Sequence, residues 1–174
     1  MNDLMIDIET LGTGFNSVIL SVGVVEFNPM NGETGNEYHW IIDPQSCIDI
    51  GMEMNYQTIE WWMRQSDEAR AIFSSVNKIT IQNAISNLSK IIGDKTRVWA
   101  NSPSFDLTIL KNACNKLKIE IPWKFWNEMD CRTLATMQPD IRWKEEYKNP
   151  THNALEDCKL QIAYVSEIYQ KLMK

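Results

Sequence analysis

Asp7 and Glu9 stand two residues apart in a short apolar run near the start of the chain. On a strand, side chains two residues apart leave the same face, so both carboxylates would point one way and Ile6 and Ile8 the other. Neighbouring carboxylates close to a core repel each other unless a cation lies between them, and Mg²⁺ prefers oxygen ligands. The pair therefore predicts a divalent-metal site, although an edge strand that ends in water would show the same pattern.

Three further residues could take part in the same chemistry. Asp106 follows Phe105 at an expected helix start, where the helix dipole also favours an acid. Asp157 lies early in the last expected helix, and His152 just precedes that helix; a histidine can accept a proton close to neutral pH. Taken singly, each fits a structural role as well: a first-turn acid, a solvated acid and a histidine near a cap.

The order of these residues resembles a known family. Asp7-Ile8-Glu9-Thr10, Asn101-x-x-x-Phe105-Asp106 and His152-x-x-x-x-Asp157 are similar to the three motifs of the DEDDh 3′→5′ exonucleases, which have a ribonuclease H-like fold. Segments outside these motifs resemble the branch that contains phage exonuclease A and a mycobacterial exoribonuclease; they are Thr58–Trp62, Gln65–Arg70, Lys124–Asn127 and Asp130–Thr133.

The resemblance implies a mechanism and a set of ligands. Asp7, Glu9, Asp106 and Asp157 would hold two divalent ions, Mg²⁺ or Mn²⁺, that activate water and stabilise the leaving 3′ oxygen. His152 would act as the general base. The substrate would be the 3′ end of single-stranded RNA or DNA, and the products nucleoside 5′-monophosphates. Related enzymes are often dimers, which makes a homodimer an additional expectation.

Four residues are candidates for substrate contacts. As a hypothesis, Thr10 and Leu11 contact the terminal nucleotide with Phe105 beside it, although plain core packing explains Leu11 and Phe105 equally well. Trp61 and its neighbour Trp62 face apart on a helix; Trp62 is expected in the core, and Trp61 could cover the substrate groove as a stacking surface.

Basic residues near the motifs have two interpretations. They contact phosphates near the site or they form a solvated surface; these residues are Lys111, Lys116, Lys118, Arg142, Lys144 and Lys148. Arg132 is instead expected to pair with an acid. The alternatives to the exonuclease on single strands are an oligoribonuclease-like enzyme and an inactive nucleic-acid-binding module. RNA and DNA are not distinguished, because the 2′-OH is recognised by contacts that no motif here defines.

The elements that must position these residues can be predicted from periodicity. Residues 4–9, 18–27 and 37–42 are expected to form an antiparallel meander, and residues 97–100 a short strand. Apolar spacing predicts a helix at 59–63, the same spacing again at 69–73, and helices over 81–92, 105–117 and 153–172, with Thr58 and Asn153 as N-terminal caps. His39 falls in the third strand and is assigned to the sheet without a chemical role. The expected fold class is therefore α/β: a ribonuclease H-like mixed β-sheet, antiparallel meander first and parallel strands after it, flanked by helices.

Composition sets the remaining bounds. The 174 residues, 44% of them hydrophobic, suit one domain over residues 1–174. Seventeen basic and twenty-three acidic residues give a net charge of −6, which argues against nucleic-acid binding through a broad basic surface. The four cysteines form no Cys-x-x-Cys pair, which makes a structural zinc site improbable. No apolar run approaches the ~20 residues of a membrane span, and a cytoplasmic protein is expected.

Overall fold

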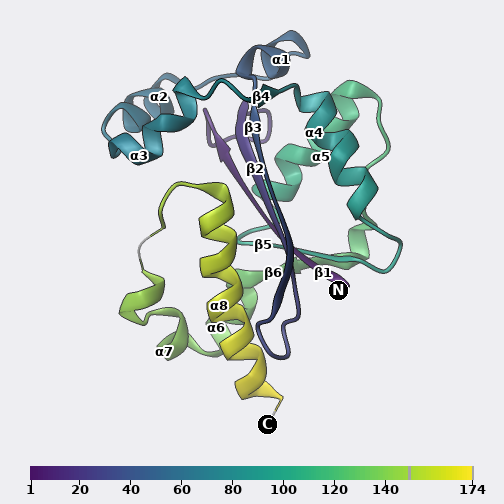
Figure 1. Cartoon of the computed structure of the whole chain (residues 1–174), viewed down its shortest axis with the longest axis vertical. Coiled ribbons are helices and arrows are strands. Elements are labelled where there is room, and N and C mark those ends of the chain that lie inside the picture. Colours follow the sequence, from purple (N-terminus) through teal and green to yellow (C-terminus); the bar gives the residue numbers. More distant parts are fainter. Residues whose placement is uncertain (149, 174) are drawn as a thin grey trace.

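A six-stranded mixed sheet forms the centre of the molecule in a computed structural model that describes residues 1–148 and 150–173 (Figure 1). The strand order is β4-β3-β2-β1-β5-β6. An antiparallel meander comes first in the chain. Of the short strands that follow, β4 and β5 pair in parallel with its two edges, and β6 pairs in parallel with β5. The predicted fold class is confirmed. The strands are β1 (Asp3–Thr10), β2 (Ile19–Phe27), β3 (Thr34–Ile42), β4 (Lys78–Ile79), β5 (Arg97–Ala100) and β6 (Glu128–Asp130).

Helices cover both faces of this sheet. Ile6 and Ile8 of β1 point into one core, where they join buried residues of α4 (Ile81–Ile91) and α5 (Asp106–Leu117). Met5 belongs to the second core, with buried residues of α6 (Cys131–Met137) and α8 (Ala154–Leu172). Because side chains alternate along a strand, Asp7 and Glu9 lie on the Met5 side, the face that α8 covers.

Short elements complete the fold. The predicted cap of the helix near Trp61 is wrong: α2 (Tyr56–Met63) begins earlier, and the Asn55 side chain, in place of Thr58, accepts hydrogen bonds from the backbone N–H groups of Gln57 and Thr58. The remaining elements are α1 (Pro44–Asp49), α3 (Asp67–Arg70), α7 (Pro139–Arg142) and the 3₁₀ turns η1 (Ala71–Ser74), η2 (Phe125–Asn127) and η3 (Glu145–Tyr147).

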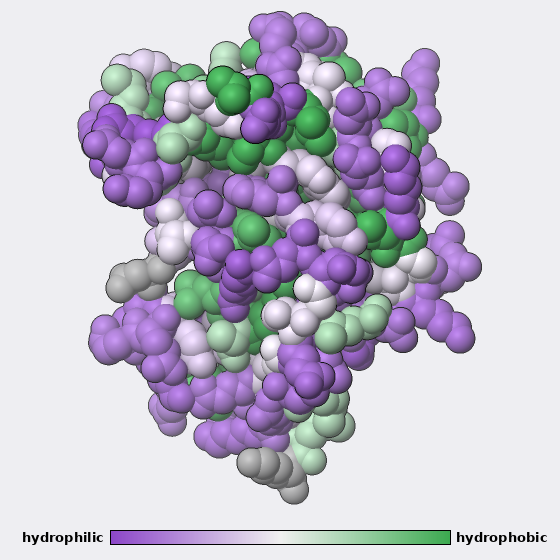
Figure 2. Space-filling model, in the orientation of Figure 1, coloured by the Kyte–Doolittle hydropathy of each residue, from purple (hydrophilic) through white to green (hydrophobic). Residues whose placement is uncertain are grey.

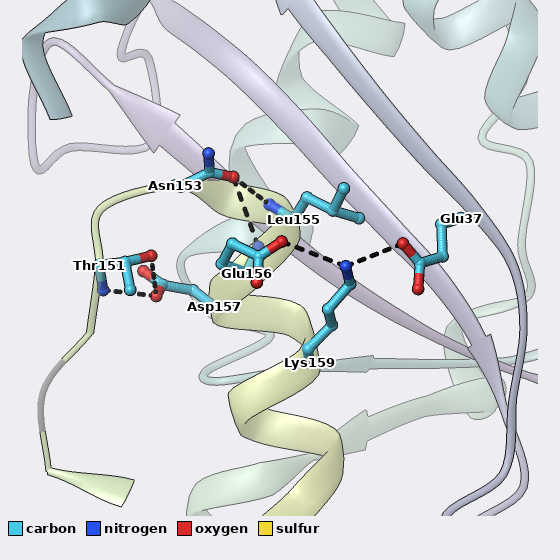
Figure 3. Close-up of polar contacts among 7 residues, drawn as sticks. All are labelled: Glu37, Thr151, Asn153, Leu155, Glu156, Asp157 and Lys159. Carbon is cyan, nitrogen blue, oxygen red and sulfur yellow. Dashed lines mark hydrogen bonds and ion pairs between the residues drawn. The ribbon is translucent and has the colours of Figure 1, made fainter. Parts of the chain in front are cut away.

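The start of α8 is held by a cap on the helix itself and by an ion pair to the sheet. Asn153 accepts hydrogen bonds from the backbone N–H groups of Leu155 and Glu156, as predicted for this cap. Lys159, one turn further along, forms ion pairs with Glu156 and with Glu37 of β3 (Figure 3). The helix therefore has a defined first turn, and that turn carries Asp157.

In the view of Figure 2, hydrophilic residues cover most of the periphery of the molecule, and hydrophobic residues lie in patches among the polar ones. Within residues 1–148 and 150–173, no helix combines the length and the apolar character needed to cross a bilayer.

Candidate active site

Asp7 and Glu9 lie side by side on the face of β1 that α8 covers. Glu9 is 9% exposed, and Asp7 Oδ1 accepts a hydrogen bond of 2.7 Å from Gln161 Nε2 of α8. Burial, followed by repulsion from Asp106 and then Glu9, raises the pKa of Asp7 well above its usual range. Burial and then repulsion from Asp157 raise the pKa of Glu9 from 4.5 to about 8. Burial and mutual repulsion thus disfavour the ionised forms of both carboxyls in the absence of a cation.

Asp106 joins this pair from the start of α5. It is buried, and its Oδ1 accepts a hydrogen bond of 3.2 Å from the backbone N–H of Ile8, the residue between the two acids of β1. Burial raises its pKa to about 7, although several backbone N–H groups act in the opposite direction. The predicted helix start at this motif thus brings a third carboxylate to the β1 pair.

Asp157 completes the group of four from the first turn of α8. It is 6% exposed, which removes the alternative of a solvated acid. Its Oδ1 accepts hydrogen bonds from the Thr151 backbone N–H at 2.7 Å and from Thr151 Oγ1 at 3.0 Å (Figure 3). Its Oδ2 accepts from the His152 backbone N–H at 3.2 Å. The carboxylate therefore fixes the backbone that carries the histidine.

His152 faces the acids from this loop. Its φ of 56° lies in the left-handed region, which costs free energy for a residue with a Cβ and is often found at functional sites. Ligand atoms of His152, Glu9 and Asp157 lie within 4.8 Å of one another. The imidazole stands perpendicular to the Trp61 ring, with 4.8 Å between the ring centroids. The histidine is thus next to the carboxylates and packed against one exposed aromatic side chain.

The four carboxylates form no ion pair with a basic side chain among the described residues. In the described part of the chain, none of them lies within 4.0 Å of a lysine or arginine nitrogen. Asp3, which is also buried on β1, differs in this respect because Arg97 Nε lies 2.7 Å from its Oδ1. Four carboxylates, three of them buried and Asp7 half-buried, that form no ion pair with a basic side chain suit hard divalent cations, and such ions would reverse the pKa shifts. The side chains present therefore fit the metal set that the resemblance implies.

A pocket of about 410 Å³ adjoins this group. It is lined by Glu9, Thr10, Phe105 and Trp61 among others, so three of the four candidate substrate residues share one cavity with a site acid. Leu11 instead packs in the core at 5% exposure, which favours the packing alternative for that residue.

The two adjacent tryptophans of α2 separate as predicted. Trp62 is 1% exposed, which confirms its place in the core, whereas Trp61 is 41% exposed. Trp62 Nε1 donates to the Thr10 backbone oxygen at 2.8 Å. This hydrogen bond holds α2 against the end of β1 and so keeps Trp61 beside the pocket.

Sequence reasoning missed three residues that position the site. Gln161 stands four residues after Asp157, a spacing that places both on one helix face, and Thr151 directly precedes His152. Gly23 pairs with Asp7 across the sheet, and a Cβ on it would lie 2.4 Å from the backbone of Ala154. A glycine inside an apolar strand is a known signal of close backbone approach, and it could have identified this contact.

Comparison with known proteins agrees with this geometry. The family model described as the 3′-5′ exoribonuclease Rv2179c-like domain matches residues 2–169. An exodeoxyribonuclease of Enterobacteria phage T4 is 29% identical over 161 residues, which cover 76% of this chain and 70% of the phage protein.

Solved structures show the same fold at low sequence identity. A complex of E. coli exonuclease I with single-stranded DNA superposes on 99% of this chain with a TM-score of 0.73 and 15% identity, and the match spans 41% of the exonuclease I chain. Exonuclease X in complex with 5′ overhanging duplex DNA gives a TM-score of 0.64 and 19% identity over 99% of this chain and 93% of that chain. A 3′-exonuclease that recognises the 3′ end of a histone mRNA stem-loop gives 0.61 and 15% over 97% and 81%.

The family model covers nearly the whole chain, and the motifs that define the DEDDh exonucleases meet in one place in the fold. The chain therefore belongs to the Rv2179c-like family of 3′-5′ exoribonuclease domains, within the DEDDh exonucleases.

Proposed function

We propose that this protein is a metal-dependent exonuclease that removes nucleoside 5′-monophosphates from the 3′ ends of single-stranded nucleic acid or 3′ overhangs. The observation that carries the proposal is a group of four carboxylates, of which Glu9, Asp106 and Asp157 are buried and Asp7 is half-buried. In the described part of the chain none of them forms an ion pair with a lysine or arginine, and the group lies next to His152 and to a pocket with an exposed tryptophan. An inactive binding module would have no need to keep charges in so unfavourable an arrangement.

The metal ligands in this proposal are Asp7, Glu9, Asp106 and Asp157, holding two ions of Mg²⁺ or Mn²⁺. When bound, these ions supply positive charge and Lewis acidity at the scissile phosphate. The chain orients three of these carboxylates before substrate arrives: the Gln161 amide holds Asp7, the Ile8 N–H holds Asp106, and backbone N–H groups of the loop before α8 hold Asp157. Preorganisation of this kind lowers the reorganisation that the reaction requires.

His152 is the general base of the proposed reaction. A ring nitrogen accepts a proton from the attacking water, the water oxygen bonds to phosphorus, and the bond from phosphorus to the 3′ oxygen breaks. The nucleotide then leaves with its phosphate on the 5′ oxygen. The bonds from the Asp157 carboxylate to the His152 and Thr151 backbone hold this loop beside the acids.

The terminal nucleotide occupies the pocket beside Glu9. Thr10 and Phe105 form part of its wall, and Trp61 offers a ring face on which a base can stack. Leu11 supports this wall from the core. Because the names of related proteins include an exodeoxyribonuclease and an mRNA 3′-exonuclease, both sugar types belong in the tests. The second candidate is an oligoribonuclease-like enzyme that degrades short RNA, since the pocket beside Glu9 has a volume of only about 410 Å³.

The test compares 3′-labelled RNA and DNA strands of one sequence in Mg²⁺, Mn²⁺ or EDTA. Wild-type protein is expected to release labelled mononucleotide only with a divalent ion, and Asp7→Asn and Asp157→Asn are expected to release none while retaining the fold by circular dichroism. Glu120→Gln is the matched control, because that side chain is 90% exposed. No release by the wild type with any divalent metal would overturn the proposal. A rate that is highest on RNA of two to five nucleotides would favour the oligoribonuclease alternative.

A further inference from the structure

A cavity of about 520 Å³ lies between α6, α7 and the end of β5, apart from the pocket beside Glu9. We call it the arginine pocket. Its polar and aromatic lining comprises Asn101 directly after β5, Arg132 and Thr136 of α6, and Arg142 and Trp143 at the end of α7. None of the described residues that line it is acidic, although the chain carries a net charge of −6.

Neither arginine has the acid partner that was expected for Arg132. Within residues 1–148 and 150–173, no carboxylate lies within 4.0 Å of the guanidinium of Arg132 or Arg142. Nearby lysines differ, since Lys111 Nζ lies 2.9 Å from Glu128 and Lys144 Nζ 2.6 Å from Glu167. Two unbalanced guanidinium groups in one cavity favour an anionic ligand, and arginine suits phosphate in particular.

The rings around Arg142 give the cavity a defined shape. The guanidinium carbon lies 4.8 Å from the Tyr164 ring centroid and 5.1 Å from that of Trp143, and Nη1 donates to the Tyr147 backbone oxygen at 2.9 Å. These contacts fix the guanidinium plane. Trp143 is nevertheless 63% exposed, so a large part of its surface is available to stack on a planar ligand.

The arginine pocket and the carboxylates lie at one edge of the sheet. Strands β1, β5 and β6 are parallel to one another, so their carboxyl ends meet at the edge where ligands bind in open sheets of this kind. Asn101 begins the loop that leads from β5 to Asp106, and Arg132 follows β6. Tyr164, beneath Arg142, hydrogen-bonds Asn101 Oδ1 at 3.3 Å.

We propose that the arginine pocket binds the nucleic-acid strand upstream of the scissile bond, with Arg132 and Arg142 on one phosphodiester group and Trp143 stacked on one base. This inference rests on the proposed function, because the strand must be the substrate held by the carboxylates. It predicts tighter binding of strands longer than a dinucleotide, and it explains how an acidic protein holds a polyanion without a broad basic surface.

The test measures KM and kcat on single strands of two, three, four, six and twelve nucleotides for Arg132→Gln and Trp143→Ala, two exposed positions. The matched controls are Lys90→Gln on the opposite face and Trp126→Ala, whose side chain is 63% exposed like that of Trp143. Wild-type KM is expected to fall with length. Trp143→Ala is expected to raise KM for the longer strands about tenfold, as for loss of one stacked base. Arg132→Gln is expected to raise KM for the longer strands and to reduce the slope of log affinity against log salt by about 0.7, the value for one phosphate of a single strand.

Equilibrium binding of a 5′-fluorescent twelve-nucleotide strand, in Ca²⁺ to prevent turnover, separates failure of this inference from failure of the proposed function. If the wild type hydrolyses no strand, the proposed function fails, and weaker binding by both variants would still support the pocket. The inference would be overturned if Arg132→Gln and Trp143→Ala matched the two controls both in KM at every strand length and in binding affinity. A change of oligomeric state in sedimentation, without a change in binding, would make this surface a contact between copies and would also overturn it.

Discussion

Replacement of Glu9 by glutamine should make the metal-free protein more stable while it abolishes activity. The pKa of Glu9 lies at about 8 in the folded protein against 4.5 in the unfolded chain, because burial and then Asp157 disfavour the charge. The folded state thus binds a proton that the unfolded chain releases, so the free energy of unfolding falls as pH rises from about 4.5 to about 8. Glutamine has nearly the same shape and no charge, so it removes this pH-dependent loss.

The size of the effect follows from the two pKa values. Each unit of difference is worth about 1.4 kcal/mol, so the glutamate lowers stability by about 4 kcal/mol at pH 7.5 and by about 1 kcal/mol at pH 5. Urea unfolding in EDTA, followed by the fluorescence of the seven tryptophans, measures the free energy of unfolding of wild type and Glu9→Gln at pH 7.5 and at pH 5. The variant is expected to gain these amounts, and Glu120→Gln, an exposed control, to change by less than about 0.5 kcal/mol.

Two results would refute the reasoning. One is a Glu9→Gln protein no more stable than wild type at pH 7.5 in EDTA, which would mean that the carboxylates do not oppose folding. The other is a gain that does not grow between pH 5 and pH 7.5. Addition of Mg²⁺ should reverse the order, because the ion stabilises the ionised wild-type site more than the variant.

Further variants test the residues around the carboxylates. His152→Ala should lower kcat by about 10²- to 10⁴-fold yet keep the rise in melting temperature on addition of Mn²⁺; loss of that rise would make the histidine a ligand and not the base. Gln161→Leu removes the donor to Asp7, so the Mg²⁺ concentration at half-maximal rate should increase, and an unchanged metal titration would show that the amide does not orient that ligand. Gly23→Ala should lower stability by about 1–3 kcal/mol in urea unfolding, because the added methyl meets the Ala154 backbone; wild-type stability would contradict the close approach.

The residues of the site that could be predicted from the sequence are those that belong to short local patterns, such as strand periodicity or a helix cap. Asp7 and Glu9 follow the period of a strand, and Asn153 precedes a helical stripe with the residues of a cap, so their elements agree with the structure. The surroundings of Asp157 could not be predicted, because a first-turn acid is usually solvated. It is buried because the start of α8 approaches β2 closely at Gly23, which is a tertiary contact.

Short elements that depend on their neighbours also escaped prediction. Strand β6 has three residues and exists through its parallel pairing with β5, and β4 has two residues beside β3. Such segments are too short to show periodicity. The true cap of α2 was missed for a related reason, since Asn55 stands before residues that carry little apolar pattern. The arginine pocket was not predicted because α6, which follows the short strand β6 directly, was not predicted.

The central claim, a divalent-metal-dependent exonuclease that begins at the 3′ end, is tested most directly by the order in which products appear. A single strand labelled at its 5′ end should shorten one nucleotide at a time in Mg²⁺, while the same strand labelled at its 3′ end should release all of its label first, as a nucleoside 5′-monophosphate. EDTA should stop both reactions. Internal fragments from the 5′-labelled strand, or release of mononucleotide in EDTA, would contradict the claim.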